Sequence, residues 1–182
     1  LGLPDFFVNK LIEVYNLDAN NDKKLIATKT AEFIDERIVI INRELGSTEA
    51  ELENFKRSAG LTSISDANTF VQESSEYEKK RMDIGTQLNL MEYLRDYIDN
   101  RANQDAVIPS NVGVNDVSLS ALINKYNEMI LERNRLLRTS SESNPVIIRK
   151  NSDLSAMRAN IRSAINSVYK GLLISKEDID RQ

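Results

Sequence analysis

The chain has 182 residues, a formal charge of -4 and an apolar fraction of 41%, which suits one folded domain with a sizeable core. Aromatic residues make up only 6% and Gly and Pro contribute six and three residues, a composition typical of long helices. The acidic balance argues against duplex nucleic acid as a partner. Because Cys and His are absent, disulfides, thiolate or imidazole metal sites, and catalysis by a Cys or His side chain are excluded.

The first segment, residues 5–15, has the apolar spacing of a short amphipathic helix. We expect a polar break over 16–21, where Asn and Asp are suited to cap a second helix. That helix, 22–58, has apolar residues at alternating steps of four and three, as in a coiled-coil seam, and Gly60 follows as a stop signal. The predicted seam residues are Ala27, Ala31, Ile34, Ile38, Ile41, Leu45, Thr48, Leu52 and Phe55.

Another long helix is predicted over 68–102. A loop follows over 104–116, because Pro109 and Gly113 interrupt regular structure there, although its Val and Ile residues are compatible with a short extended piece. The predicted seam of the 68–102 helix consists of Phe70, Tyr77, Ile84, Leu88, Met91, Leu94 and Ile98.

The last two predicted helices, 118–142 and 145–174, should form a hairpin. Asn144 is suited to cap the second of them, and Pro145 then takes the first helical position, where a missing N–H costs nothing. Their predicted seams are Leu119, Leu122, Tyr126, Met129 or Ile130, and Leu136, then Ile147, Leu154, Met157, Ile161, Ala164, Val168 and Leu172. The expected fold over 1–182 is therefore one mainly α domain: long antiparallel helical hairpins with coiled-coil-like heptad packing and little or no sheet.

One group of acidic residues imitates a metal site. Asp18, Asn20 and Asp22 match the first ligands of a calcium loop, but Lys23 stands where Gly is needed and Lys29 where the bidentate Glu belongs. A helix cap is the better interpretation. Carboxylate pairs elsewhere lie on expected exposed helix faces, and the sequence has no phosphate-binding glycine motif. We therefore predict no catalytic residue, no metal ligand and no cofactor-binding residue.

A basic group surrounds the predicted reversal between the last two helices and is the candidate contact site of the chain. It consists of Arg133, Arg135, Arg138, Arg149 and Lys150. Such a group could attract an acidic polymer or an acidic partner. The alternative is ordinary ion pairing with the nearby Glu128, Glu132 and Glu142.

Several stretches resemble a known family. AEFIDER (31–37) and ELGSTEAELENFK (44–56) are similar to the periplasmic helical region of Wzz-type polysaccharide co-polymerases. LINKYNE (122–128), ERNRLL (132–137) and SNPVI (143–147) are similar to the GNVR-type, tyrosine-kinase-fused branch of that family in Bacteroidetes. With 11–15 and 154–173, the resemblance covers most of the chain, although helical motifs are less specific than a catalytic signature.

The resemblance implies a bacterial inner-membrane parent with one membrane helix on each side of a periplasmic domain, often followed by a cytoplasmic tyrosine autokinase that uses ATP and Mg. For this chain, which we expect to begin partway into the periplasmic domain, it implies a non-enzymatic scaffold that regulates the polymerisation, chain length or export of exopolysaccharide or capsule. The implied partners are other copies of the parent and the polysaccharide polymerase and export machinery, with the polysaccharide itself as a further candidate. The family's kinase motifs have no counterpart in these residues.

Two other interpretations fit the same heptads. An adaptor hairpin of a secretion or efflux assembly would be flanked by lipoyl-like β segments, whereas a cytoplasmic coiled-coil scaffold would have no membrane helices in its gene. The flanking sequence therefore separates all three hypotheses.

Overall fold

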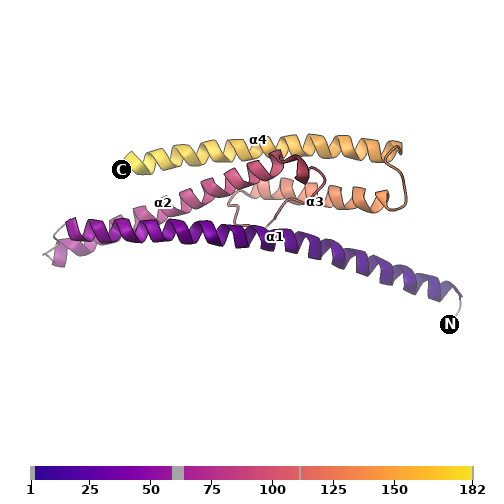
Figure 1. Cartoon of the computed structure of the whole chain (residues 1–182), viewed down its shortest axis with the longest axis horizontal. Helices are drawn as coiled ribbons and strands as arrows, with labels where there is room; N and C mark the ends of the chain where they lie inside the picture. Colours follow the sequence, from indigo (N-terminus) through magenta and orange to yellow (C-terminus); the bar gives the residue numbers. More distant parts are fainter. Residues whose placement is uncertain (1–2, 59–63, 111, 182) are drawn as a thin grey trace.

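The computed structural model describes residues 3–58, 64–110 and 112–181, and within these ranges the chain is helical without any strand. The elements in chain order are α1 (Leu3–Ser58), α2 (Ile64–Asp99), the 3-10 turn η1 (Arg101–Asn103), α3 (Val117–Leu137) and α4 (Pro145–Arg181) (Figure 1). The prediction of a mainly α fold is confirmed.

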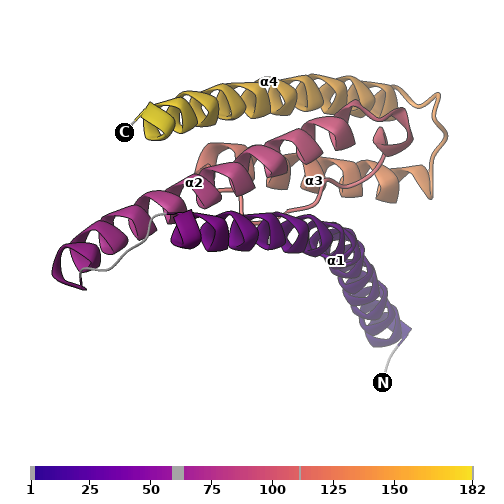
Figure 2. The same cartoon turned by 60° about the vertical axis from the view of Figure 1, so that its left-hand side comes forward.

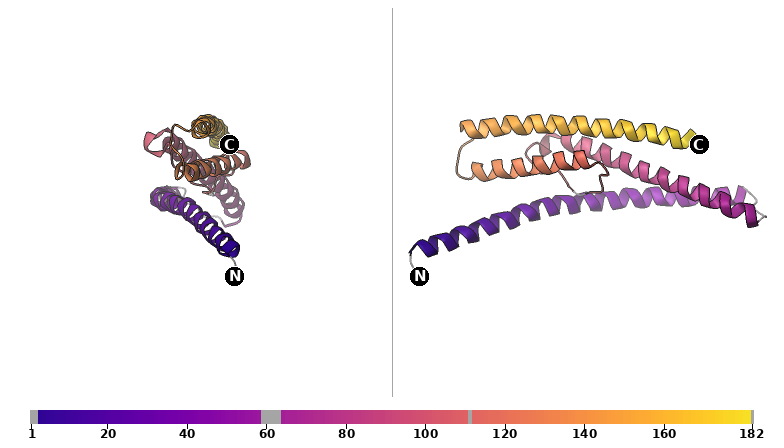
Figure 3. Two further views of the ribbon diagram at one scale, coloured as in Figure 1. Left: turned by 90° about the vertical axis from the view of Figure 1, so that its right-hand side faces the viewer. Right: turned by 180° about the vertical axis from the view of Figure 1, so that it is seen from behind.

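The helices α3 and α4 form the predicted antiparallel hairpin, and α2 packs against α4 (Figure 3). Asp116 caps α3 by accepting a hydrogen bond from the backbone N–H of Leu119 at 2.7 Å. Asn144 caps α4 by accepting one from the backbone N–H of Val146 at 2.9 Å. Pro145 is the first residue of α4, so the predicted cap and start of this helix are confirmed, whereas α3 begins at Val117, one residue before its predicted start.

Other predicted helix ends were less accurate. The helix α3 stops at Leu137 rather than 142, because the backbone N–H groups of Arg138 and Thr139 close a tightened last turn on Arg135 and Leu136. The helix α2 covers 64–99 rather than 68–102, because Asn100 becomes extended and caps η1. The helix α4 continues past 174 to Arg181, and Asp180 in this extension forms an ion pair with Arg81 of α2 at 3.3 Å.

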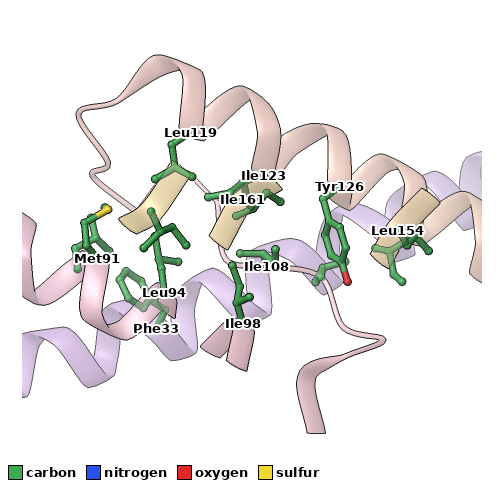
Figure 4. Packing of buried hydrophobic residues seen from close by; sticks show 14 residues of the cluster. Phe33, Met91, Leu94, Ile98, Ile108, Leu119, Ile123, Tyr126, Leu154 and Ile161 are labelled. Carbon is green, nitrogen blue, oxygen red and sulfur yellow. The ribbon is translucent and has the colours of Figure 1, made fainter. Parts of the chain in front are cut away.

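The core lies where α2, α3 and α4 meet, and Phe33 is the fully buried residue that α1 contributes among its described side chains (Figure 4). The predicted seam of α4 is confirmed, because every member is buried or half-buried. In α2 the seam is confirmed from Leu88 to Ile98, but Tyr77 is 43% exposed and was wrongly assigned. Phe70 lies outside the residues whose side chains are described. The main buried residues are Leu90, Met91, Leu94, Ile98, Val107, Ile108, Leu119, Ile123, Tyr126, Ile130, Leu154, Ile161 and Ile165.

The loop between η1 and α3 passes through this core instead of over its surface. Residues 107–110 are all buried, and none of the described loop residues forms a strand. Because buried backbone groups need hydrogen-bond partners, a side chain has to supply them, and Asn127 of α3 does so for Ile108.

The helix α1 differs most from expectation. It is one continuous helix, so the predicted short helix 5–15 and the break over 16–21 are both wrong. Each Asn or Asp in a helix interior costs only tenths of a kcal/mol. When residues 16–22 are helical, Asp18 and Asp22 form ion pairs with Arg138 and Arg135, and these pairs offset that cost. Tertiary contacts thus outweigh a weak local signal. Figure 2 shows the N-terminal end of α1 running away from the other helices.

The predicted seam of α1 also has the wrong register. Ile34 and Ile38 are 44% and 50% exposed, and Ala27 and Ala31 are exposed as well. The helix instead packs through Phe33, whose ring centroid lies 4.6 Å from that of Tyr93 on α2. The buried and half-buried residues of this face are Asp22, Ile26, Lys29, Phe33 and Arg37. The remaining predicted seam residues, Ile41, Leu45, Thr48, Leu52 and Phe55, and the stop signal Gly60 lie outside the described side chains.

Candidate functional site

Two arginines of the predicted basic group join α3 to α1. Arg135 forms an ion pair with Asp22, and Arg138 donates a hydrogen bond to Asp18 at 2.8 Å. Asp18 and Asp22 lie one helical turn apart on α1, so their carboxylates share one face. Two of the three residues that imitated a calcium loop, Asp18 and Asp22, are therefore the acceptors of interhelical ion pairs, and they neither cap a helix nor stand in a loop.

The two ion pairs are partly shielded from water, which strengthens the attraction between their charges moderately. The Asp22 and Asp18 side chains are largely shielded from water, whereas both arginine side chains are about half exposed. The hydrogen bond to Asp22 raises the pKa of Arg135 above its ordinary value, against an opposing effect of desolvation. Pairs of this kind contribute at most about 1 kcal/mol each to stability. Their main effect is on where α1 lies.

Arg133 points elsewhere, toward the core loop. Its Nη2 pairs with Asp105 and its Nη1 donates to Asn134 at 3.0 Å. Only 11% of the Arg133 side chain is exposed, and its Nε is buried without a hydrogen-bond partner. An unsatisfied buried donor of this kind is uncommon and costs free energy, so Arg133 has a hydrogen-bonding capacity that the described chain does not use.

Two members of the predicted basic group, Arg149 and Lys150, lie on α4 and behave differently from each other. Lys150 pairs with Glu132 at 2.8 Å, as the alternative interpretation expected, and this hydrogen bond lowers the pKa of Glu132. Arg149 is exposed and forms no ion pair within the described part of the chain. Glu128 pairs with Lys125 at 3.5 Å instead of with an arginine. The structure thus brings Arg133, Arg135 and Arg138 to acidic residues far away in sequence, and contact with an acidic polymer stays a prediction.

Arg158 of α4 is an important residue that the sequence analysis did not single out. Its Nε and Nη2 donate to the carbonyl oxygen of Ile98 at 3.1 and 2.6 Å, and its Nη1 donates to the carbonyl oxygen of Asn103 and to Tyr126 Oη. Arg158 therefore ties α4 to the end of α2, to η1 and to α3. The sequence around Arg158 did not indicate this role, because an arginine on a helix ordinarily lies on the protein surface.

A hollow of about 500 Å³ opens beside Arg158, and we refer to it as the Arg158 pocket. Its walls come from the end of α2, from η1 and the start of the core loop, and from the hairpin of α3 and α4. Tyr126 and Leu154, which line it, lie at the same end of the core in Figure 4. Arginine, amide and hydroxyl side chains dominate the remaining wall, including Arg133, Gln104, Asn151 and Ser155. It suits a polar ligand better than an apolar one.

A second hollow of about 370 Å³ lies between α1 and the end of α2. Tyr93 and Tyr97 line it with their rings stacked at 6.1 Å between centroids, and Glu32 and Glu36 face them from α1. Burial, together with the negative charge of Glu36, raises the pKa of Tyr93 to about 12. Tyr93 is therefore a neutral phenol at physiological pH and a poor general base.

Among the described residues, no group of three or more Asp or Glu side chains is arranged to hold a metal ion. Within those same ranges, no helix is long and apolar enough to cross a membrane. Comparison of the chain with protein-family models, curated proteins and solved structures finds no match.

Proposed function

We propose that this chain is the helical part of a non-catalytic periplasmic scaffold in a bacterial inner-membrane polysaccharide co-polymerase. In this role the parent protein regulates the polymerisation, length or export of a surface polysaccharide through the packing of its helices. The proposal is supported by the resemblance of 31–56 and 122–147 to that family. A cytoplasmic tyrosine kinase in the same parent belongs to the proposal, and no residue of this chain would act in it.

The observation that carries a scaffold role is the uncovered apolar surface of α1. The side chains of residues 6–17 are exposed, and Figure 2 shows this end of the helix extending beyond the bundle. A contiguous apolar surface exposed to water is typical of a protein–protein interface. We propose that other copies of the parent cover it, next to the polymerase and export machinery. The exposed side chains are Phe6, Phe7, Val8, Leu11, Ile12, Val14, Tyr15 and Leu17.

The sequence of the flanking gene separates this proposal from its alternatives before any assay. Two membrane helices around the segment favour a co-polymerase, whereas lipoyl-like β segments favour an adaptor hairpin. A gene without membrane helices favours a cytoplasmic scaffold.

The functional test is made in the bacterium that carries the gene. Surface-polysaccharide amount and length are compared between the intact gene and a deletion of residues 22–174, with immunoblots showing that the shortened protein is made and inserted. The proposal predicts a changed amount or length distribution. An inserted deletion protein with unchanged polysaccharide would contradict it.

The scaffold surface has its own test in the full parent protein. Leu11→Ser removes an exposed apolar side chain from α1, whereas Asn9→Ser alters an exposed polar neighbour on the same helix. We expect in-membrane chemical cross-linking into oligomers to fall for Leu11→Ser and to stay unchanged for Asn9→Ser. Equal cross-linking in both variants would place the interface elsewhere.

A further inference from the structure

The Arg158 pocket contains more positive charge than its own carboxylates neutralise. Asp99 pairs with Arg162 at 2.5 Å and Asp105 pairs with Arg133, so both pairs are balanced. Arg158 has no carboxylate within ion-pair distance among the described residues, and its bonds go to carbonyl oxygens and a phenol. Carbonyl dipoles orient a guanidinium but leave its net charge in place.

Two other charged residues line the pocket and have to be considered. Arg101 and Glu142 are both exposed, and since their signs are opposite, they leave the balance of the pocket unchanged. Water also screens exposed charges far more than half-buried ones. The half-buried charge of Arg158 therefore dominates the electrostatics of the pocket.

Donors are available for an oxyanion. A guanidinium has five N–H groups, and Arg158 uses them in four bonds, which leaves one N–H of Nη2. The buried Nε of Arg133 lacks an acceptor. Arg158 and Arg133 both line the pocket, and arginine side chains suit a carboxylate or a phosphate because charge-assisted hydrogen bonds to such groups are the strong ones.

The remaining wall indicates the body of the ligand. A volume of about 500 Å³ exceeds what a bare oxyanion fills, and the polar side chains of Gln104, Asn151 and Ser155 can hydrogen-bond hydroxyl groups. Tyr126 and Leu154, both almost fully buried, close the apolar side of the pocket. A hydroxylated ring with a single acidic group matches both the polar side and the apolar side of the pocket.

We propose that the Arg158 pocket binds the carboxylate of an acidic sugar unit, with the arginines holding the carboxylate and the amide and hydroxyl side chains holding the ring. This deepens the proposed function, since it names the class of polymer unit that the scaffold would contact. It also moves the contact away from Arg135, Arg138 and Lys150, whose charges are paired elsewhere, and retains Arg133 alone from the predicted basic group.

The test is an NMR titration of the 182-residue chain with glucuronate, followed through the backbone amide signals. Glucose is the neutral control, and inorganic phosphate is the bare oxyanion. We expect millimolar binding of glucuronate that shifts amides around the Arg158 pocket, and at least about tenfold weaker binding of both controls.

Three variants locate the binding. Arg133→Lys keeps a positive charge beside Asp105 but removes the free Nε donor, and Ser155→Leu fills the pocket from an exposed position without breaking a hydrogen bond of the fold. Both should weaken glucuronate binding about tenfold. Arg138→Lys, outside the pocket, is the matched control and should bind like the wild type.

The outcomes separate this inference from the scaffold proposal. Absence of glucuronate binding, or binding unaffected by Ser155→Leu, would overturn the pocket assignment and leave the scaffold proposal standing. Equal binding of phosphate would overturn the acidic-sugar assignment in favour of a bare oxyanion site. A deletion strain with unchanged polysaccharide would instead contradict the scaffold proposal, whatever the chain binds in solution.

Discussion

The side-chain amide of Asn127 satisfies both backbone groups of Ile108: its Oδ1 accepts from the Ile108 N–H at 2.8 Å, and its Nδ2 donates to the Ile108 carbonyl oxygen at 2.7 Å. Asn127 is only 2% exposed, and Ile108 is completely buried. Together with Tyr97, whose hydroxyl donates to the Val107 carbonyl oxygen at 2.8 Å, this side chain allows a loop segment without strand or helix partners to cross the core. The walls of the Arg158 pocket depend on it, because the start of the same loop forms part of them.

Replacing Asn127 should therefore destabilise the whole bundle. Asn127→Leu keeps the approximate size of the side chain but leaves the N–H and C=O of Ile108 buried without partners, at about 2–5 kcal/mol for the two groups together. Urea unfolding followed by circular dichroism measures the change. Asn124→Leu, at an exposed position of the same helix, is the control and should change stability by less than about 0.5 kcal/mol. Similar losses in both variants would show that the amide bridge is not what stabilises the loop.

A pair of identical substitutions tests the register of the helices. Ile161 is completely buried and Ile38 is 50% exposed, so Ile161→Asp places a charge in the core whereas Ile38→Asp places one in water. We expect Ile161→Asp to cost several kcal/mol and Ile38→Asp less than about 1 kcal/mol. Thermal melts of both variants provide the comparison. A cooperative melt near the wild-type temperature for Ile161→Asp would contradict the packing of α4.

The contrast between α4 and α1 shows when the sequence alone identifies the buried face of a helix. In α4 the apolar residues between 149 and 172 follow one stripe, so their period identifies the buried side, and the exposed apolar residues Val146, Ile148, Leu173 and Ile174 lie near its ends. In α1, apolar residues occur on more than one stripe, and the period alone cannot choose between Ile34 and Phe33. The choice depends on Tyr93, which lies on another helix and supplies the ring that packs on Phe33.

The residues of the candidate site were also only partly predictable from the sequence. The proximity of Arg133, Arg135 and Arg138 follows from their spacing on one helix. Their partners Asp18, Asp22 and Asp105 do not, because they come from distant segments. The role of Arg158 depends on carbonyl groups at the end of α2, and backbone groups carry no residue-specific signal.

The salt dependence of α1 docking follows from its ion pairs. Asp22→Asn keeps the shape of the side chain but removes the charge that Arg135 faces, and we expect a loss of no more than about 1 kcal/mol. Hydrogen exchange in residues 18–30 should become faster in the variant, and high salt should accelerate it in the wild type but less in Asp22→Asn. An equal response to salt in both proteins would mean that the pair does not hold α1.

Alkaline pH should weaken the fold through Tyr93. Its pKa rises from 10.0 to about 12 in the folded chain, so the unfolded chain releases the phenolic proton first as pH increases. The stabilisation from a neutral buried phenol is complete below pH 10 and is lost as pH rises toward 12. Because the ring is partly exposed, we expect about 1 kcal/mol. Tyr93→Phe should lose less stability over this range, and parallel curves for both proteins would contradict the assignment.

The central proposal is that Arg135 and Arg138 act by holding the long helix of a polysaccharide scaffold in place, and a charge exchange in cells tests it most directly. Arg135→Asp and Asp22→Arg each place like charges opposite one another, and the double variant restores an opposite pair in reversed order. With protein level and membrane insertion matched, surface-polysaccharide length is measured in all three strains and in the wild type. The account predicts that each single variant alters the length distribution and that the double variant restores it. A double variant as defective as Arg135→Asp, together with a normal Asp22→Arg strain, would contradict it and assign Arg135 to direct contact with an acidic polymer or partner.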